Sequence, residues 1–165
     1  MQGVIERIIS QLVNNQEGKA WIGPNYQSKL KEITDENAFT RPLPDLHSVA
    51  EIISHLTTWQ KETILKIRTG EGSLTDDCEE NWYSNDKLRE KKWGTIWKEY
   101  QESLAEIIAL LQTKEDSFLE EQYYDTDFKG NYTYSFVING MLHHNLYHLG
   151  QLGIIIKYLK LEGKY

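Results

Sequence analysis

The chain has 165 residues, with 25 acidic and 18 basic side chains and a formal net charge of -7 at pH 7. Its length suffices for one domain with a sizeable core, and its 39% hydrophobic and 12% aromatic residues exclude a disordered chain. We therefore expect a single domain over residues 1–165. The acidic balance argues against nucleic acid as a partner, because the average surface repels phosphate backbones.

We expect neither a signal peptide in the N-terminal stretch nor a membrane span. The N-terminal stretch alternates charged and apolar residues, unlike the unbroken apolar run of a signal peptide. No apolar stretch approaches the roughly 20 residues of a membrane span. A single cysteine, Cys78, cannot form an internal disulfide, and its acidic surroundings disfavour a reactive thiol. We expect a cytoplasmic protein with no membrane partner.

Apolar residues recur at spacings of three and four, the pattern of amphipathic helices, in four segments of the chain. The first covers residues 4–13. A long crossover follows, which contains all three prolines and one short helix expected around residues 26–33. The second long helix is expected over residues 46–68, where Ser48 and Glu51 have the spacing of a capping box.

The third long helix follows an acidic loop at residues 71–83. Ser84 or Asn85 can cap the segment that comes next, and the apolar stripe of this helix extends over residues 93–111.

The pattern then breaks before the last helix. Asp116 is expected to cap a single turn, and the turn residues 129–131 favour a small hairpin. The fourth helix follows and stops near Gly163. Four helices with long links predict an all-α protein, a four-helix bundle with long crossover connections.

Three histidines on two of these helices are candidate metal ligands. His144 and His148 are four residues apart, so their rings project from one face of a helix. Such a pair alone is more often two structural or exposed histidines than a metal site. His55 lies at the border of the second helix's buried stripe and can supply a third imidazole. Three imidazoles around a divalent ion leave positions open, as in catalytic sites.

Two residues beside the trio can orient an imidazole by accepting its far N–H. Glu51 lies one turn before His55, and Gln151 lies three residues after His148. A capping role for Glu51 and a solvated side chain for Gln151 are equally good interpretations.

The remaining candidates have more ordinary interpretations. Trp59 is expected in the core, although it can instead wall a pocket beside the metal. His47 and His143 are expected to be surface or structural residues. Gly150 and Gly153 interrupt the last helix, and they indicate either a close approach of another group or chance drift.

The segment HNLYHLGQ, from His144 to Gln151, together with VAEIISHLTTW around His55 and WIGPNYQSKLKEITDENAF upstream, resembles the DinB-like superfamily of YfiT-type metal-dependent enzymes. The resemblance implies a four-helix bundle, frequently a homodimer. It also implies one divalent metal ion per chain, zinc or nickel, on His55, His144 and His148.

Members of that superfamily include S-transferases that conjugate bacillithiol or a related small thiol to electrophiles, thiol-dependent isomerases and metal-dependent hydrolases. The resemblance therefore implies a small-molecule substrate, with a thiol S-transferase as the leading expectation and a metal-dependent hydrolase as the alternative. A second alternative is a non-catalytic, dimeric metal-binding stress protein.

Overall fold

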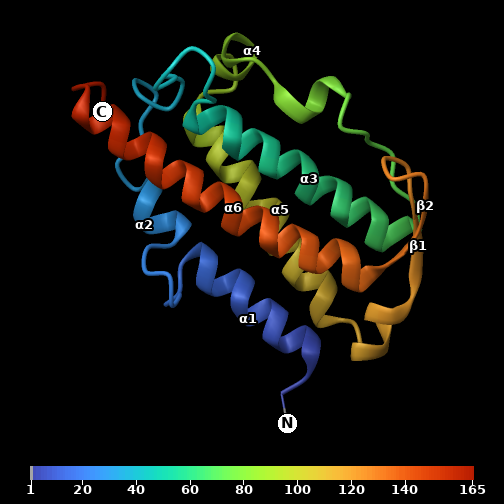
Figure 1. Ribbon diagram of the computed structural model, residues 1–165. Helices are drawn as coiled ribbons and strands as arrows, with labels where there is room; N and C mark the ends of the chain where they lie inside the picture. Colours follow the sequence, from blue (N-terminus) through green and yellow to red (C-terminus); the bar gives the residue numbers. More distant parts are fainter. Residues whose placement is uncertain (1) are drawn as a thin grey trace.

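Four long helices make up half of the computed structural model, which describes residues 2–165. They are α1 (Val4–Gln16), α3 (Val49–Thr69), α5 (Trp93–Gln112) and α6 (Tyr134–Leu161). Helix α3 packs against α5 and α6, and α1 packs against the same two helices (Figure 1). The predicted all-α four-helix bundle is confirmed.

Helices α3 and α5 are neighbours that run in the same direction. Lys61 Nζ lies 3.9 Å from Glu99 Oε2, and Arg68 NH2 lies 2.7 Å from Glu106 Oε1. The later residue of α3 therefore meets the later residue of α5, as in parallel helices. A connection between parallel helices must return along the whole bundle, about 30 Å for a helix of 20 residues. Residues 70–92 make this return over the outside of the bundle (Figure 1).

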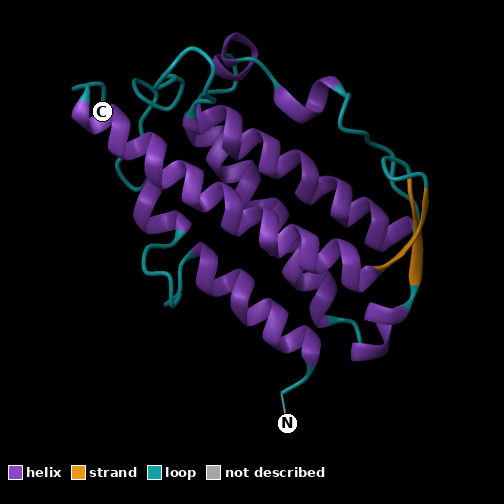
Figure 2. Cartoon of the chain, in the orientation of Figure 1, coloured by secondary structure: helices purple, strands orange, loops and turns teal. Residues whose placement is uncertain are grey.

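Short elements fill the three connections (Figure 2). They are α2 (Tyr26–Leu30) in the first, η1 (Glu79–Trp82) and α4 (Asn85–Arg89) in the second, and η2 (Asp116–Glu120), β1 (Gln122–Asp125) and β2 (Gly130–Thr133) in the third. Strands β1 and β2 pair antiparallel, with Gln122 opposite Thr133. The predicted hairpin is confirmed, and it lies at the end of the bundle where α3 ends and α6 begins.

The helix starts follow local capping. Ser48 Oγ accepts from Glu51 N at 3.2 Å and Glu51 Oε2 accepts from Ser48 N at 2.8 Å, so the predicted capping box holds and α3 begins at Val49. Ser84 caps only the short α4. Helix α5 begins afresh at Trp93, because Lys92 has a φ of 65° and breaks the helical path.

Asp116 caps a different helix from the one predicted. Glu115 occupies the N-cap position of η2. The carboxylate of Asp116 instead accepts hydrogen bonds from Val4 N at 2.8 Å and Ile5 N at 2.9 Å, the free amides at the start of α1. Local sequence could not predict this contact, because Asp116 and the start of α1 are more than a hundred residues apart in sequence.

The core consists of two apolar clusters separated by a buried polar layer. One cluster surrounds α2 and the C-terminal half of α6, and the other lies between α1 and the hairpin. Between them Gln60, Ser103, Asn145 and His148 are all buried. None of the helices in residues 2–165 is long and apolar enough to cross a membrane.

The two glycines of α6 differ in their surroundings. A Cβ at Gly150 would meet nothing within 4 Å, whereas a Cβ at Gly153 would lie 2.7 Å from Lys29 Nζ. Gly153 therefore accommodates the end of a lysine side chain from α2. No close neighbour within residues 2–165 accounts for Gly150.

Candidate metal centre

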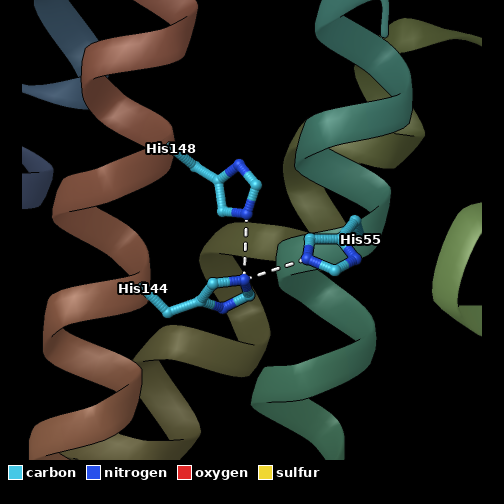
Figure 3. A group of neighbouring side chains, drawn as sticks. All are labelled: His55, His144 and His148. Carbon is cyan, nitrogen blue, oxygen red and sulfur yellow. Dashed lines mark hydrogen bonds between the residues drawn. The ribbon is translucent and has the colours of Figure 1, made fainter. Parts of the chain in front are cut away.

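The three predicted histidines meet between α3 and α6 (Figure 3). His55 projects from α3, and His144 and His148 project from successive turns of α6. His144 Nε2 lies 2.9 Å from His55 Nε2 and 2.9 Å from His148 Nε2. The ligand atoms of the three residues all lie within 4.8 Å of one another. This spacing matches three imidazoles directed at one point.

Hydrogen bonds on the far side of two rings fix which nitrogen carries the proton. His55 Nδ1 lies 2.9 Å from the carbonyl oxygen of Asn81, and His148 Nδ1 lies 2.6 Å from Gln151 Oε1. Both oxygens only accept, so each Nδ1 carries a proton and each Nε2 presents a lone pair. A single proton on His144 Nε2 can satisfy only one of these two neighbours. The three Nε2 atoms therefore fit a cation that lies between the rings and accepts their lone pairs. Zinc sites have the same arrangement, in which each histidine binds the ion through one nitrogen and donates the N–H of the other to an acceptor.

The three rings are neutral at pH 7. Burial, followed by the neighbouring His148 and His55, lowers the pKa of His144 to about 3. Burial and then His55 lower the pKa of His148 to about 4, and burial also lowers the pKa of His55. Neutral imidazole is the form that binds a metal ion, so the site is ready for one at physiological pH.

We expect metal binding to depend only weakly on pH between 7.5 and 5. Imidazoles with an ordinary pKa of about 6.5 take up protons over this range, and each then weakens metal binding about tenfold per pH unit. His144 and His148, with pKa values of about 3 and about 4, stay unprotonated. Only His55 can then take up a proton in this range, so the apparent dissociation constant for zinc, measured by competition with a chelator, should rise less than the roughly thirtyfold that one imidazole of ordinary pKa would cause. A rise of several hundredfold would contradict these depressed pKa values.

Trp82 supports His55 in a way that the sequence did not reveal. Its ring stacks between two histidines, with centroids 3.9 Å from His55 and 3.7 Å from His47 and interplanar angles of 5° in both cases. Asn81, beside it, accepts from His55 Nδ1 and also from Trp59 Nε1 at 2.9 Å. The only sequence signal was a tryptophan inside an otherwise acidic, polar loop.

The two predicted orienting residues have different outcomes. Gln151 contacts His148 as expected. The predicted contact between Glu51 and His55 is wrong, because the Glu51 carboxylate is engaged by Arg41 Nε at 3.0 Å and by the backbone of Ser48. Burial acts to raise the pKa of Glu51, but these hydrogen bonds outweigh it and hold the pKa below its usual value. Glu51 is therefore a capping residue.

Replacing Gln151 with alanine should weaken metal binding about 10–100-fold, because His148 would lose the acceptor that fixes its ring and its proton. The fold should be unaffected, since Gln151 is only partly buried. Chelator competition on the folded variant measures the change. His143→Ala is a suitable control, because His143 is exposed on the same helix. Equal affinity in the two variants would exclude a supporting role for Gln151.

A cavity of about 300 Å³ opens beside the trio and is lined by His55, His144, Trp59, Asn145 and side chains of the hairpin end of the bundle. Trp59 is half-buried and walls this cavity, which corrects its assignment to the core. Within residues 2–165 no carboxylate or thiol joins the three imidazoles as a further ligand. An ion held there would keep coordination positions free for a small molecule.

The family model of the DinB superfamily matches residues 24–152. This chain belongs to the DinB superfamily. The matched residues contain the whole histidine trio, so the predicted family is confirmed.

Two solved structures from Bacillus subtilis share the fold. The DinB-like protein YjoA is 12% identical, with a TM-score of 0.64 over 93% of this chain and 92% of that chain. YfiT, described as a probable metal-dependent hydrolase with an unusual four-helix bundle topology, is 13% identical, with a TM-score of 0.54 over 97% of this chain and 84% of that chain. No curated protein matches the chain.

Proposed function

We propose that the chain is an enzyme that depends on one divalent metal ion, zinc or nickel, held by Nε2 of His55, His144 and His148. The observation that carries the proposal is the convergence of these atoms at a cavity of about 300 Å³, a volume at the lower end of small-molecule sites. A metal with a purely structural role is usually enclosed by four protein ligands, whereas this set offers three.

For the reaction we propose transfer of a small thiol, of the bacillithiol type, to an electrophile. A bound divalent ion lowers the pKa of a thiol or water that reaches it. The chain's own contribution is to hold the three imidazoles neutral and fixed and to seat the thiol and the electrophile in the cavity. The sulfur forms a bond to the electrophilic carbon, the leaving group departs with the bonding pair, and the thiol proton passes to solvent.

The lack of a carboxylate directly beside the three imidazoles supports this reaction over hydrolysis. Hydrolysis of an amide or ester requires a group that takes the proton of water and gives it to the leaving group. Within residues 2–165 no Asp or Glu lies within ligand distance of the trio, and the cavity carboxylates of Asp76 and Asp127 are not among the groups that meet there. Attack by a thiolate on an electrophile with a good leaving group needs no proton donor. Hydrolysis remains the second candidate, supported by the shared fold with YfiT and its description as a probable metal-dependent hydrolase.

Conjugation assays distinguish these functions. Zinc- or nickel-loaded protein is mixed with 1-chloro-2,4-dinitrobenzene or a comparable electrophile, with and without a small thiol, and the products are identified by mass spectrometry. We expect a thioether that forms only with thiol, metal and intact His148. A product that contains water instead would establish a hydrolase. If neither forms with any of a panel of electrophiles and esters, the protein is a metal-binding protein without this catalysis.

We also propose that the chain forms a homodimer, as the family resemblance implies. Helix α6 leaves Tyr147 63% exposed and Ile154 69% exposed, with Gly150 between them on the same face. Exposed apolar side chains in line on one helix are typical of a protein contact. Light scattering that gives the mass of one chain at micromolar concentration would contradict the dimer.

A further inference from the structure

The cavity extends well beyond the metal centre. His55 and Lys66 both line it and are eleven residues apart on α3, which corresponds to about 16 Å along the helix. Helix α6 runs antiparallel beside it, because His144 meets His55 at one end and Tyr134 Oη donates to the carbonyl of Lys66 at the other. The site therefore accepts an elongated molecule with one end at the imidazoles.

Two buried amides in the cavity wall have hydrogen-bonding atoms without partners. Gln60 is 1% exposed and Asn145 is 2% exposed, and both line the cavity. Gln60 Nε2 and Asn145 Oδ1 make no hydrogen bond within residues 2–165. Buried polar atoms in native proteins nearly always have partners, and those that lack them within the chain often meet water or a ligand. These amides indicate that the cavity receives a polar ligand.

The part of the cavity beside the hairpin has an excess of negative charge, and Asp76 reaches it by donating its backbone N–H to Asp127 Oδ1 at 2.9 Å. Lys66 Nζ lies 2.9 Å from Asp125 Oδ2, so the one lysine or arginine among the described residues that line the cavity is already neutralised. Asp76 and Asp127 also line it, and neither forms an ion pair within residues 2–165. Burial and the neighbouring carboxylates of Asp127 and Asp77 raise the pKa of Asp76, as expected where positive charge is lacking.

Aromatic rings lie beside these carboxylates. Phe128 and Phe136 both line the cavity, with ring centroids 5.7 Å apart and planes at 78° to each other. They are 58% and 46% exposed, so their surfaces are available to a ligand. The faces of aromatic rings attract cations, and a carboxylate nearby adds to the attraction.

We propose that the substrate of this site is a small elongated molecule with a positively charged group, an ammonium or a guanidinium, at the end away from the metal. Asp76 and Asp127 bind this group beside Phe128 and Phe136, while the other end of the molecule reaches the three imidazoles. The identity of the reactive end rests on the proposed function. The charge of the far end rests on the acidic residues alone.

A matched set of ligands tests the proposal. 6-Aminohexane-1-thiol, 6-mercaptohexan-1-ol and 6-mercaptohexanoate differ only in the charge of the far end. Their binding to the cobalt-loaded protein is followed by the sulfur-to-metal absorption band and by calorimetry. We expect the amine to bind at least about tenfold more tightly than the alcohol, with the carboxylate weakest, and we expect this order to weaken in high salt.

Two variants test whether the cavity carboxylates cause the preference for the amine. Asp127→Asn keeps the oxygen that accepts from Asp76 N at 2.9 Å but removes the charge, so it should abolish the preference for the amine without changing the affinity for the alcohol. Asp77→Asn, a neighbouring charge outside the cavity lining, is the control and should retain most of the preference. Equal binding of the three thiols, or strongest binding of the carboxylate, would overturn the proposal and leave the proposed function intact.

A further pair of ligands tests the cationic substrate independently of the proposed thiol transfer. Hexan-1-amine and hexanoate carry no thiol, and their binding to the metal-free protein reports on the acidic end alone. Tighter binding of the amine, together with no metal–sulfur band for any thiol, would refute the thiol-transfer function and support the cationic substrate. No preference for the amine in either experiment would overturn the inference.

Discussion

Alanine in place of His148 should yield a protein that retains almost no divalent metal after purification, whereas the wild type should retain about one ion per chain. Two of the three convergent Nε2 atoms would remain, and His144 Nε2 would lose a neighbour at 2.9 Å. Loss of a ligand should weaken binding by more than the roughly 10–100-fold that accompanies loss of a supporting hydrogen bond. Elemental analysis by mass spectrometry gives the metal content directly.

His55→Ala should behave in the same way, because its ligand comes from the other helix and has no substitute nearby. His143→Ala is the matched control: it removes an exposed imidazole from α6, one residue before His144, and should leave the metal content unchanged. Circular dichroism should show that all three variants keep their helices. Full metal content in both His55→Ala and His148→Ala would refute the site.

Replacing Lys66 with methionine should lower the free energy of unfolding by about 3–5 kcal/mol, the usual cost of leaving a buried charge without its partner. Lys66 is 4% exposed and Asp125 is 1% exposed, and Glu62 Oε1 lies 3.8 Å from the same ammonium group. Asp125 also accepts from Tyr123 Oη at 3.0 Å, so the network ties the hairpin to α3. Urea denaturation followed by circular dichroism measures the loss.

Two control variants test whether the loss of stability comes from the buried charge of Lys66. Lys61→Met removes an exposed lysine that pairs loosely with Glu99, and it should change stability by no more than about 0.5 kcal/mol. Adding Asp125→Asn to Lys66→Met should recover part of the lost stability, because one unpaired carboxylate is then removed. A cost below about 1 kcal/mol for Lys66→Met would show that these carboxylates reach solvent or bind protons instead.

Local patterns in the sequence were enough to predict much of the bundle. The capping box of Ser48 and Glu51 and the apolar periodicity place α3 to within three residues of its start. The spacing of His144 and His148 likewise follows from the geometry of a single helix. A capping box and a pair of residues on one helix face each depend on residues within one or two turns of each other. The spacing of residues in the sequence is therefore enough to predict them.

Other features depend on contacts between distant segments. The parallel pairing of α3 with α5 follows from how residues 70–92 return along the bundle, and no local pattern encodes that path. The stacking of Trp82 on His55 depends on the same return, as does the Asn81 carbonyl that orients His55. Helical spacing left two roles open for Glu51, a contact with His55 and a cap for α3, and could not reveal that Arg41 binds its carboxylate.

The coordination of the bound ion is the most direct test of the metal centre. Cobalt-loaded protein studied by X-ray absorption should show three imidazole nitrogens and one or more exchangeable oxygen ligands, and a small thiol should replace an oxygen with sulfur. This result would establish an open three-histidine site. A cobalt ion without imidazole neighbours, or one fully enclosed by protein ligands that admit no thiol, would contradict it.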